Sequence, residues 1–186
     1  MHGYNAADAA ATAFREYLSL DKLVTGIQLE RGLSAAWLSS RGTNVEAKNR
    51  LTSLWAQNDD ALQSLTRWPT GDGLHVADKA LQSAKELSVH VNTLRAAVIS
   101  NDMTFKQEIK EYTAVTSALM SWSLSVVVLS STSTIWPMIV SNAALLLASD
   151  VIGIQRALEI TLKTLPRKRS LFKLCCWQIS LVLSIH

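Results

Sequence analysis

Residues that interrupt helices are scarce in this sequence of 186 residues. It holds 3 prolines and 7 glycines, which favours long helices over an all-β fold because glycine and proline mark turns. The clearest break is Pro69-Thr70-Gly71-Asp72-Gly73, which is too short to be an interdomain linker. Hydrophobic residues make up 48% of the chain and charged residues 18%. This composition excludes disordered, collagen-like and disulfide-framework proteins, and the length suits one domain.

The spacing of apolar residues predicts five helices with short connections. Steps of four and three place Leu20, Val24, Ile27 and Leu38 on one helical stripe, and Gly42 follows in a position typical of a helix stop. The predicted helices span residues 7–40, 44–68, 74–100, 104–129 and 135–165. We therefore expect an all-α domain over residues 1–165, an elongated antiparallel helical bundle of about five helices. Residues 166–186 form a basic and apolar tail with no assignment.

The basic charge of the chain lies in that tail. Residues 166–186 carry 4 of the 18 basic side chains and no acidic one, so residues 1–165 hold 14 basic and 15 acidic side chains. This balance argues against a nucleic-acid-binding surface, which needs clustered Lys and Arg. The first twenty residues contain no apolar run and predict no signal peptide. Localisation stays open.

Two segments raise the question of membrane contact. Residues 112–149 contain no charged side chain, but their apolar runs are shorter than the roughly 20 residues of a membrane span. We favour a buried helical hairpin over a membrane hairpin. In the tail, residues 171–186 are mostly apolar, and they fit an interfacial segment with Cys175 and Cys176 as palmitoylation candidates. They fit equally the start of a longer element or a non-native end.

Enzyme motifs are absent from the sequence. It has no glycine-rich phosphate loop, no G-x-S-x-G and no H-E-x-x-H. The four histidines lie away from cysteines and carboxylates at ligand spacing, and adjacent cysteines lack the spacing of a zinc site. We therefore expect no catalysis, no metal and no cofactor.

Three arginines stand among apolar residues of predicted helices. Arg31 occupies the stripe of the first helix, and Arg95 and Arg156 each have apolar residues four positions before and after them. A buried arginine needs a partner, because an unpaired buried charge costs several kcal/mol. Arg31 can pair with an acid from another helix, and Arg95 and Arg156 can snorkel to the edge of the core. Alternatively, the three can converge on one small planar oxyanion, whose oxygens match the guanidinium fork.

The segment around Arg31 resembles a known family signature. Residues 27–42 read IQLERGLSAAWLSSRG, similar to the Q-x-E-R-G-x-S-[AG] motif of nitrate- and nitrite-sensing (NIT) domains. Weaker similarities follow in the same order: Leu94-Arg95, then Tyr112-Thr113, then G-x-x-R-A at residues 153–157. The resemblance extends over about residues 20–165.

The resemblance implies an all-helical sensor that binds nitrate or nitrite through arginines and relays a helix rearrangement to a signalling output. Such domains occur in bacterial regulators, histidine kinases, chemotaxis receptors and animal receptor-type guanylate cyclases. It implies Arg31 and Arg156 as the main anion ligands, with Arg95 third and Tyr112 as a hydroxyl donor. The expected partners are the anion and a signalling output domain or protein. A homodimer and membrane association through the tail remain open.

One alternative function stays open. The bundle can be a helical interaction or dimerisation module, a sensor fragment without anion binding. In that case the three arginines pair with Glu or Asp side chains.

Overall fold

The computed structural model describes residues 3–65, 67–69, 73–129 and 136–164. The predicted all-α fold is confirmed: five helices make up this part of the chain, with one small hairpin. The elements are α1 (Gly3–Ser39), α2 (Val45–Gln63), β1 (Leu74–Val76), β2 (Lys79–Leu81), α3 (Ala84–Ile99), α4 (Phe105–Leu129) and α5 (Trp136–Thr164).

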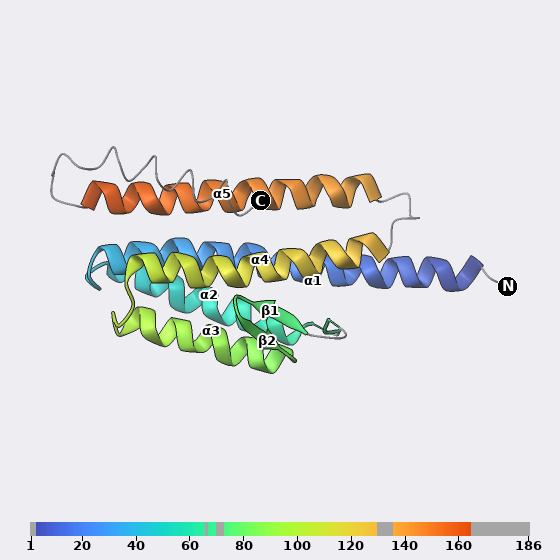
Figure 1. The fold of residues 1–186 in the computed structure, drawn as a ribbon, viewed down its shortest axis with the longest axis horizontal. Coiled ribbons are helices and arrows are strands. Elements are labelled where there is room, and N and C mark those ends of the chain that lie inside the picture. Colours follow the sequence, from blue (N-terminus) through green and yellow to red (C-terminus); the bar gives the residue numbers. More distant parts are fainter. Residues whose placement is uncertain (1–2, 66, 70–72, 130–135, 165–186) are drawn as a thin grey trace.

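Successive helices run in opposite directions along one long axis (Figure 1). Helix α1 is the centre of the bundle, because it packs on α2, α4 and α5 and also touches α3. Helices α1 and α5 run parallel: Tyr17 contacts Ile139, and Arg31 contacts Asp150 about three to four turns later in both helices. This arrangement places the part of α1 that resembles the family signature, from residue 27 onward, against three other helices.

A glycine turn ends α1, and a polar side chain caps the start of α2. Arg41 and Gly42 adopt positive φ values of 54° and 77°, and the amide of Gly42 donates to the carbonyl of Trp37. The predicted glycine stop at Gly42 is therefore confirmed. Asn44 then caps α2, because its side-chain oxygen accepts from the amide of Ala47 at 3.0 Å.

The predicted helix over residues 74–100 is wrong in its first third. Strands β1 and β2 pair antiparallel there, with Leu74 opposite Leu81 and Val76 opposite Lys79. The alternation of Leu74 and Val76 inward with His75 outward is strand-like. Helix α3 begins only after Ser83, whose hydroxyl accepts from the amide of Glu86.

The core is apolar, and it lies where α1 meets α2, α3, α4 and the hairpin. Two tryptophans at the edges of the core donate their indole N–H groups to backbone carbonyls. Trp37 donates to Val98 at 3.1 Å, and Trp68 donates to Leu81 at 3.0 Å. Fully buried members include Leu20, Leu23, Val24, Ile27, Leu51, Leu81, Leu87, Val98, Val115 and Leu119. Both tryptophan rings thereby tie α1 and the segment before the hairpin to the same core.

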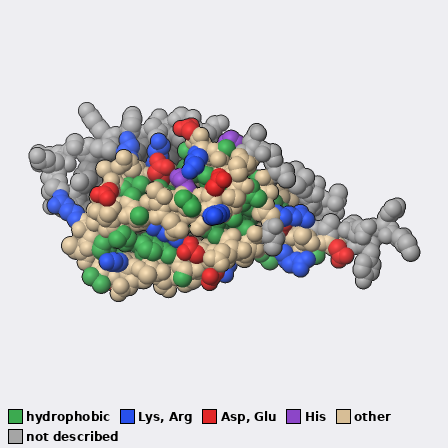
Figure 2. Space-filling view, turned by 90° about the horizontal axis from the view of Figure 1, so that it is seen from below, with side chains coloured by type: hydrophobic (Ala, Val, Ile, Leu, Met, Phe, Trp, Pro, Cys, Tyr) green, Lys and Arg blue, Asp and Glu red, His purple; other side chains and the backbone are tan. Residues whose placement is uncertain are grey.

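The lower face of the bundle is mixed in charge. Figure 2 shows this face, where Lys and Arg side chains alternate with Asp and Glu among polar and apolar atoms. The tail assigned to residues 166–186, with Cys175 and Cys176, lies outside the described residues, and so do its expected membrane contacts.

Candidate functional site

Arg31 is a buried cation held between three helices. Its residue surface is 1% exposed, and Nη1 lies 2.9 Å from Oδ1 of Asp150 on α5. Nη1 donates to the hydroxyl of Thr113 on α4 at 3.1 Å, and Nη2 donates to the backbone carbonyl of Asp150 at 3.1 Å. Arg31 therefore joins α1 to both α4 and α5.

Glycine makes room for that guanidinium on α5. A Cβ atom added at Gly153 would come within 3.0 Å of Nη2 of Arg31. Gln28, one turn before Arg31, supports the same contact, since its Nε2 donates to Oδ1 of Asp150 at 3.3 Å and to the carbonyl of Leu146 at 3.4 Å. Gly153, the first residue of the G-x-x-R-A segment, thus lies against Arg31 of α1.

Arg95 is bound to acidic side chains. Its Nε and Nη2 donate to the two carboxylate oxygens of Glu30 at 2.8 and 3.0 Å, and its Nη1 donates to Asp59 at 2.7 Å. Nη1 also donates to Asn92 at 3.0 Å, and the guanidinium lies 5.5 Å from the centre of the Trp55 ring. Burial disfavours the charge of Arg95, but the hydrogen bonds and charges of Glu30 and Asp59 raise its pKa.

The carboxylate of Glu30 accepts four hydrogen bonds from residues on three other helices. Besides Arg95, Asn58 on α2 donates to Oε2 at 2.8 Å, and the hydroxyl of Tyr112 on α4 donates to Oε1 at 2.8 Å. Burial, followed by the charge of Glu30, raises the pKa of Tyr112 well above its ordinary value. This Glu30 cluster, defined as Glu30, Asn58, Arg95 and Tyr112, satisfies a fully buried carboxylate.

Glu108 is a second buried carboxyl group on this side of the bundle. It is 0% exposed, and neither of its oxygens has a hydrogen-bond partner among the described residues. Burial raises its pKa to about 9; the nearby charge of Arg31 opposes the rise, and the charge of Glu30 adds to it. Glu108 is therefore uncharged at neutral pH.

Arg156 lies apart from the other three predicted ligands. It is exposed on α5, six residues beyond Asp150 and so about 9 Å further along the axis. The structure brings Arg95 and Tyr112 together on Glu30, and it places Arg31 on Asp150. Arg156 makes no hydrogen bond or ion pair with another described residue.

Sequence reasoning missed three acidic residues of this region. Glu30 is adjacent to Arg31 in sequence but points about 100° away from it on the helix, and it pairs with Arg95 instead. Asp150 is the first charged residue after the uncharged stretch 112–149, which is a signal that it faces a partner. Glu108 carries a weaker signal, because it precedes Tyr112 by one helical turn.

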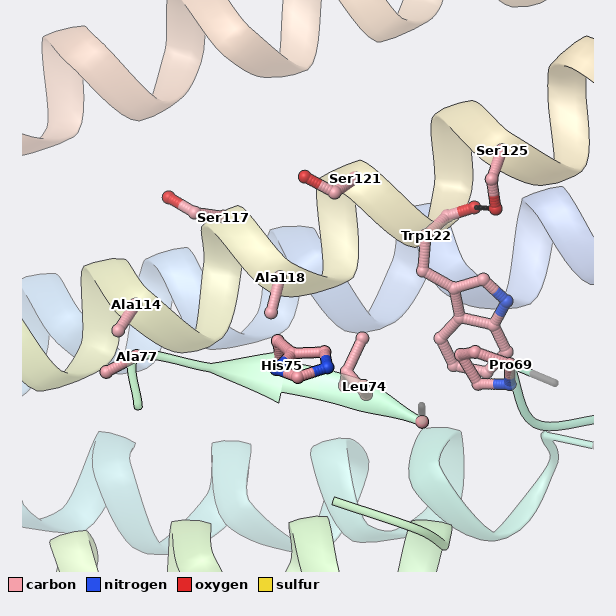
Figure 3. A pocket seen from close by; sticks show the side chains of 11 residues that line it. Pro69, Leu74, His75, Ala77, Ala114, Ser117, Ala118, Ser121, Trp122 and Ser125 are labelled. Carbon is pink, nitrogen blue, oxygen red and sulfur yellow. Dashed lines mark hydrogen bonds between the residues drawn. The ribbon is translucent and has the colours of Figure 1, made fainter. Parts of the chain in front are cut away.

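A separate open groove lies between the hairpin and α4 (Figure 3). Its volume is about 520 Å³. Small α4 side chains such as Ala118 and Ser121 form one wall, and Leu74, His75 and Pro69 form the other. Only His75 among the lining residues can carry a positive charge, so this groove does not suit an anion.

Helix α5 has exposed apolar side chains that do not pack on α1. The most exposed is Leu145, at 65%; the others are Val140, Leu147, Val151 and Ile152. Residues Ile139–Arg156 form one stretch of the described chain that is long and apolar enough to cross a membrane, and 22% of it is buried. Core helices of soluble proteins pass the same test, so this finding alone does not make α5 a span.

The chain was compared with models of protein families. The model described as nitrate and nitrite sensing matches residues 22–162, which include Arg31, Glu30, Arg95, Glu108, Tyr112, Asp150 and Arg156. No curated protein and no solved structure matches the chain. The matched family is one of sensor domains rather than of catalysts. From the helical bundle, the motif around Arg31 and this match over most of its length, the chain belongs to the NIT family of nitrate- and nitrite-sensing domains.

Proposed function

We propose that this chain binds nitrate or nitrite at Arg31 and that the anion takes the place of the Asp150 carboxylate there. The observation that carries the proposal is the contact of a fully buried guanidinium with a carboxylate from a different helix, at 2.9 Å. A carboxylate presents two oxygens in a plane, as nitrate and nitrite do, and the guanidinium fork matches that geometry. Asp150 is thus an internal substitute for the ligand.

The exchange supplies a route for the signal. Arg31 and Gln28 hold α5 through Asp150, and Asn142, about two turns earlier on α5, adds hydrogen bonds to Tyr17 and Asp21. When the anion occupies Arg31, the second half of α5 loses its main polar contact with α1. A ligand shifts a conformational equilibrium only by its different affinities for the two states. Competition with Asp150 provides that difference and passes it to a downstream output through α5.

Of the remaining predicted ligands, Arg95 and Tyr112 act indirectly in this proposal. The Glu30 cluster already occupies their donors, so they hold α1 in place beside the site. Arg156 contributes only a screened charge from the surface of α5.

Nitrate should raise the thermal stability of the full chain more than chloride does at the same ionic strength. At about 100 times its dissociation constant, a ligand adds roughly 2.7 kcal/mol to stability. The rise should vanish in Arg31→Gln, whereas Arg156→Gln should change nitrate affinity by less than about threefold, because exposed charges are screened. Thermal unfolding over a nitrate series measures both variants. A nitrate effect that persists in Arg31→Gln would contradict the proposed site.

Asp150→Asn should bind nitrate at least about tenfold more tightly than the unaltered chain. The substitution removes the competing negative charge and keeps the size of the side chain, and an internal competitor weakens apparent affinity by the fraction of time it occupies the site. Calorimetric titration with sodium nitrate gives the two dissociation constants. Asp21→Asn, on the α1–α5 interface away from Arg31, is the matched control. Equal affinities in Asp150→Asn and the unaltered chain would rule out competition.

The exposed apolar face of α5 favours a second candidate function, a helical interaction module that pairs with another copy of the chain. A helix that is apolar on most sides is usually covered. Sedimentation of the unaltered chain over a range of concentrations should then show a dimer, and Leu145→Glu or Val151→Glu should dissociate it. A monomer at all concentrations would exclude self-association.

A further inference from the structure

Three polar atoms buried between α1 and α4 lack a hydrogen-bond partner. They are both carboxyl oxygens of Glu108 and the hydroxyl of Ser34, which lies close enough to the Tyr112 hydroxyl to oppose the rise of the Tyr112 pKa. Ser34 and Glu108 are each 0% exposed. Buried polar groups in native proteins are nearly always satisfied by protein, water or ligand, because an unsatisfied one costs about 1–3 kcal/mol. These atoms therefore face something that accepts or donates hydrogen bonds.

The unpartnered atoms belong to the same region as Arg31. Ser34 follows Arg31 by one helical turn on α1, so both side chains leave the helix on neighbouring positions of one face. Glu108 lies on the α4 face that packs there, one turn before Tyr112, and the charge of Arg31 acts on it. The Arg31 guanidinium, the Ser34 hydroxyl and the Glu108 carboxyl group thus belong to one part of the contact between α1 and α4.

We propose that Glu108 is a ligand of the anion: its carboxylic acid O–H, with the hydroxyl of Ser34, donates to an anion oxygen that Arg31 does not hold. The inference rests on the proposed anion site at Arg31 and adds a neutral donor to it. An oxyanion offers separate oxygens to Arg31 and to Glu108, whereas chloride offers one atom. Glu108 therefore favours nitrate and nitrite over chloride.

The charges around Glu108 keep it in the donor form. Arg31 and Glu30 face it from α1, and Tyr112 faces it from its own helix. Glu30 is fixed by four hydrogen bonds, and Tyr112 is held neutral by burial and by Glu30. With its pKa raised to about 9, Glu108 is protonated at neutral pH. Entry of the anion then adds one negative charge to the site rather than placing two side by side.

This coupling gives anion binding a defined pH dependence. The bound state needs protonated Glu108, so affinity is constant below the pKa of the free protein and falls about tenfold per pH unit above it. Around pH 10 most free molecules carry ionised Glu108, so nitrate binding takes up close to one proton there. At pH 7 it takes up none.

Titration calorimetry of the full chain with sodium nitrate tests this, at pH 7 and near pH 10, in two buffers that differ in ionisation enthalpy. Glu108→Gln keeps an N–H donor without a titration, so we expect affinity within about threefold of the original at pH 7 and no proton uptake near pH 10. Glu108→Leu lacks the donor and should bind at least about tenfold more weakly, because hydrogen bonds to charged groups are strong. Glu111→Gln, on the same helix but partly exposed, should behave as the unaltered chain.

Glu108→Leu removes a buried unpartnered group and so should fold at least as stably as the unaltered chain. If nitrate binds at pH 7 in an Arg31-dependent way but Glu108→Leu binds equally well, or the unaltered chain takes up no proton near pH 10, Glu108 is not a ligand and a water occupies the cluster. In that case the proposed function still stands. If nitrate does not bind the unaltered chain at pH 7, the anion site itself is wrong.

Discussion

Replacing Glu30 with alanine should lower the free energy of unfolding by about 3–5 kcal/mol, the cost of breaking a buried ion pair from one side. The substitution leaves the Arg95 guanidinium, 5% exposed, with only Asp59 as a charged partner. It also removes the hydrogen-bond acceptor of the Tyr112 hydroxyl and of the Asn58 side-chain amide. Three helices lose their shared contact with α1 at once.

Chemical denaturation of the full chain measures the loss. Glu46→Ala, at an exposed position in the first turn of α2, is the control and should change stability by less than about 1 kcal/mol. A double-mutant cycle with Arg95→Met isolates the pair, because removing both charges should cost less than the sum of the single losses. A loss at Glu30 no larger than at Glu46 would show that the cluster does not hold the bundle together.

The helices were predictable because each depends on its own neighbours in sequence. The stripe from Leu20 to Leu38, the stop at Gly42 and the polar break before α2 are local patterns, and the structure follows them. The segment 74–81 was not predicted, because its apolar residues fit a helix and a strand equally over so short a run. The capping hydroxyl of Ser83, with Glu86 three residues later, was the local signal that α3 begins after it.

The side-chain partners were much less predictable. Periodicity placed Arg31 and Arg95 on apolar faces, and the structure shows both buried and paired with acids from other helices. Which acid each one meets depends on the rotation and register of two helices, information that no single helix carries. For Arg156 the apolar neighbours were misleading as evidence of burial, since Ile152, one turn before it, is itself 47% exposed. Anion binding by any of them stays a prediction.

Two glycines within α1 should respond to alanine in opposite directions. At Gly26 an added Cβ would overlap the Oδ1 atom of Asn58, and Asn58 is buried and hydrogen-bonded to Glu30, so it must rotate away and lose that bond. Overpacking and the lost bond together should cost about 2–4 kcal/mol. At Gly32 an added Cβ meets nothing within 4 Å, so alanine there should stabilise by about 0.5–1 kcal/mol through helix propensity alone.

The pair is informative because both substitutions add the same methyl group to the same helix. Any general effect of alanine on α1 appears equally in both variants, and the difference of about 2–4 kcal/mol reports the approach of α2 at Gly26. Chemical denaturation of the two variants side by side measures it. Destabilisation at both positions would mean that another segment or molecule covers Gly32. Stabilisation at both would mean that α1 and α2 do not approach as closely as the Gly26–Asn58 contact requires.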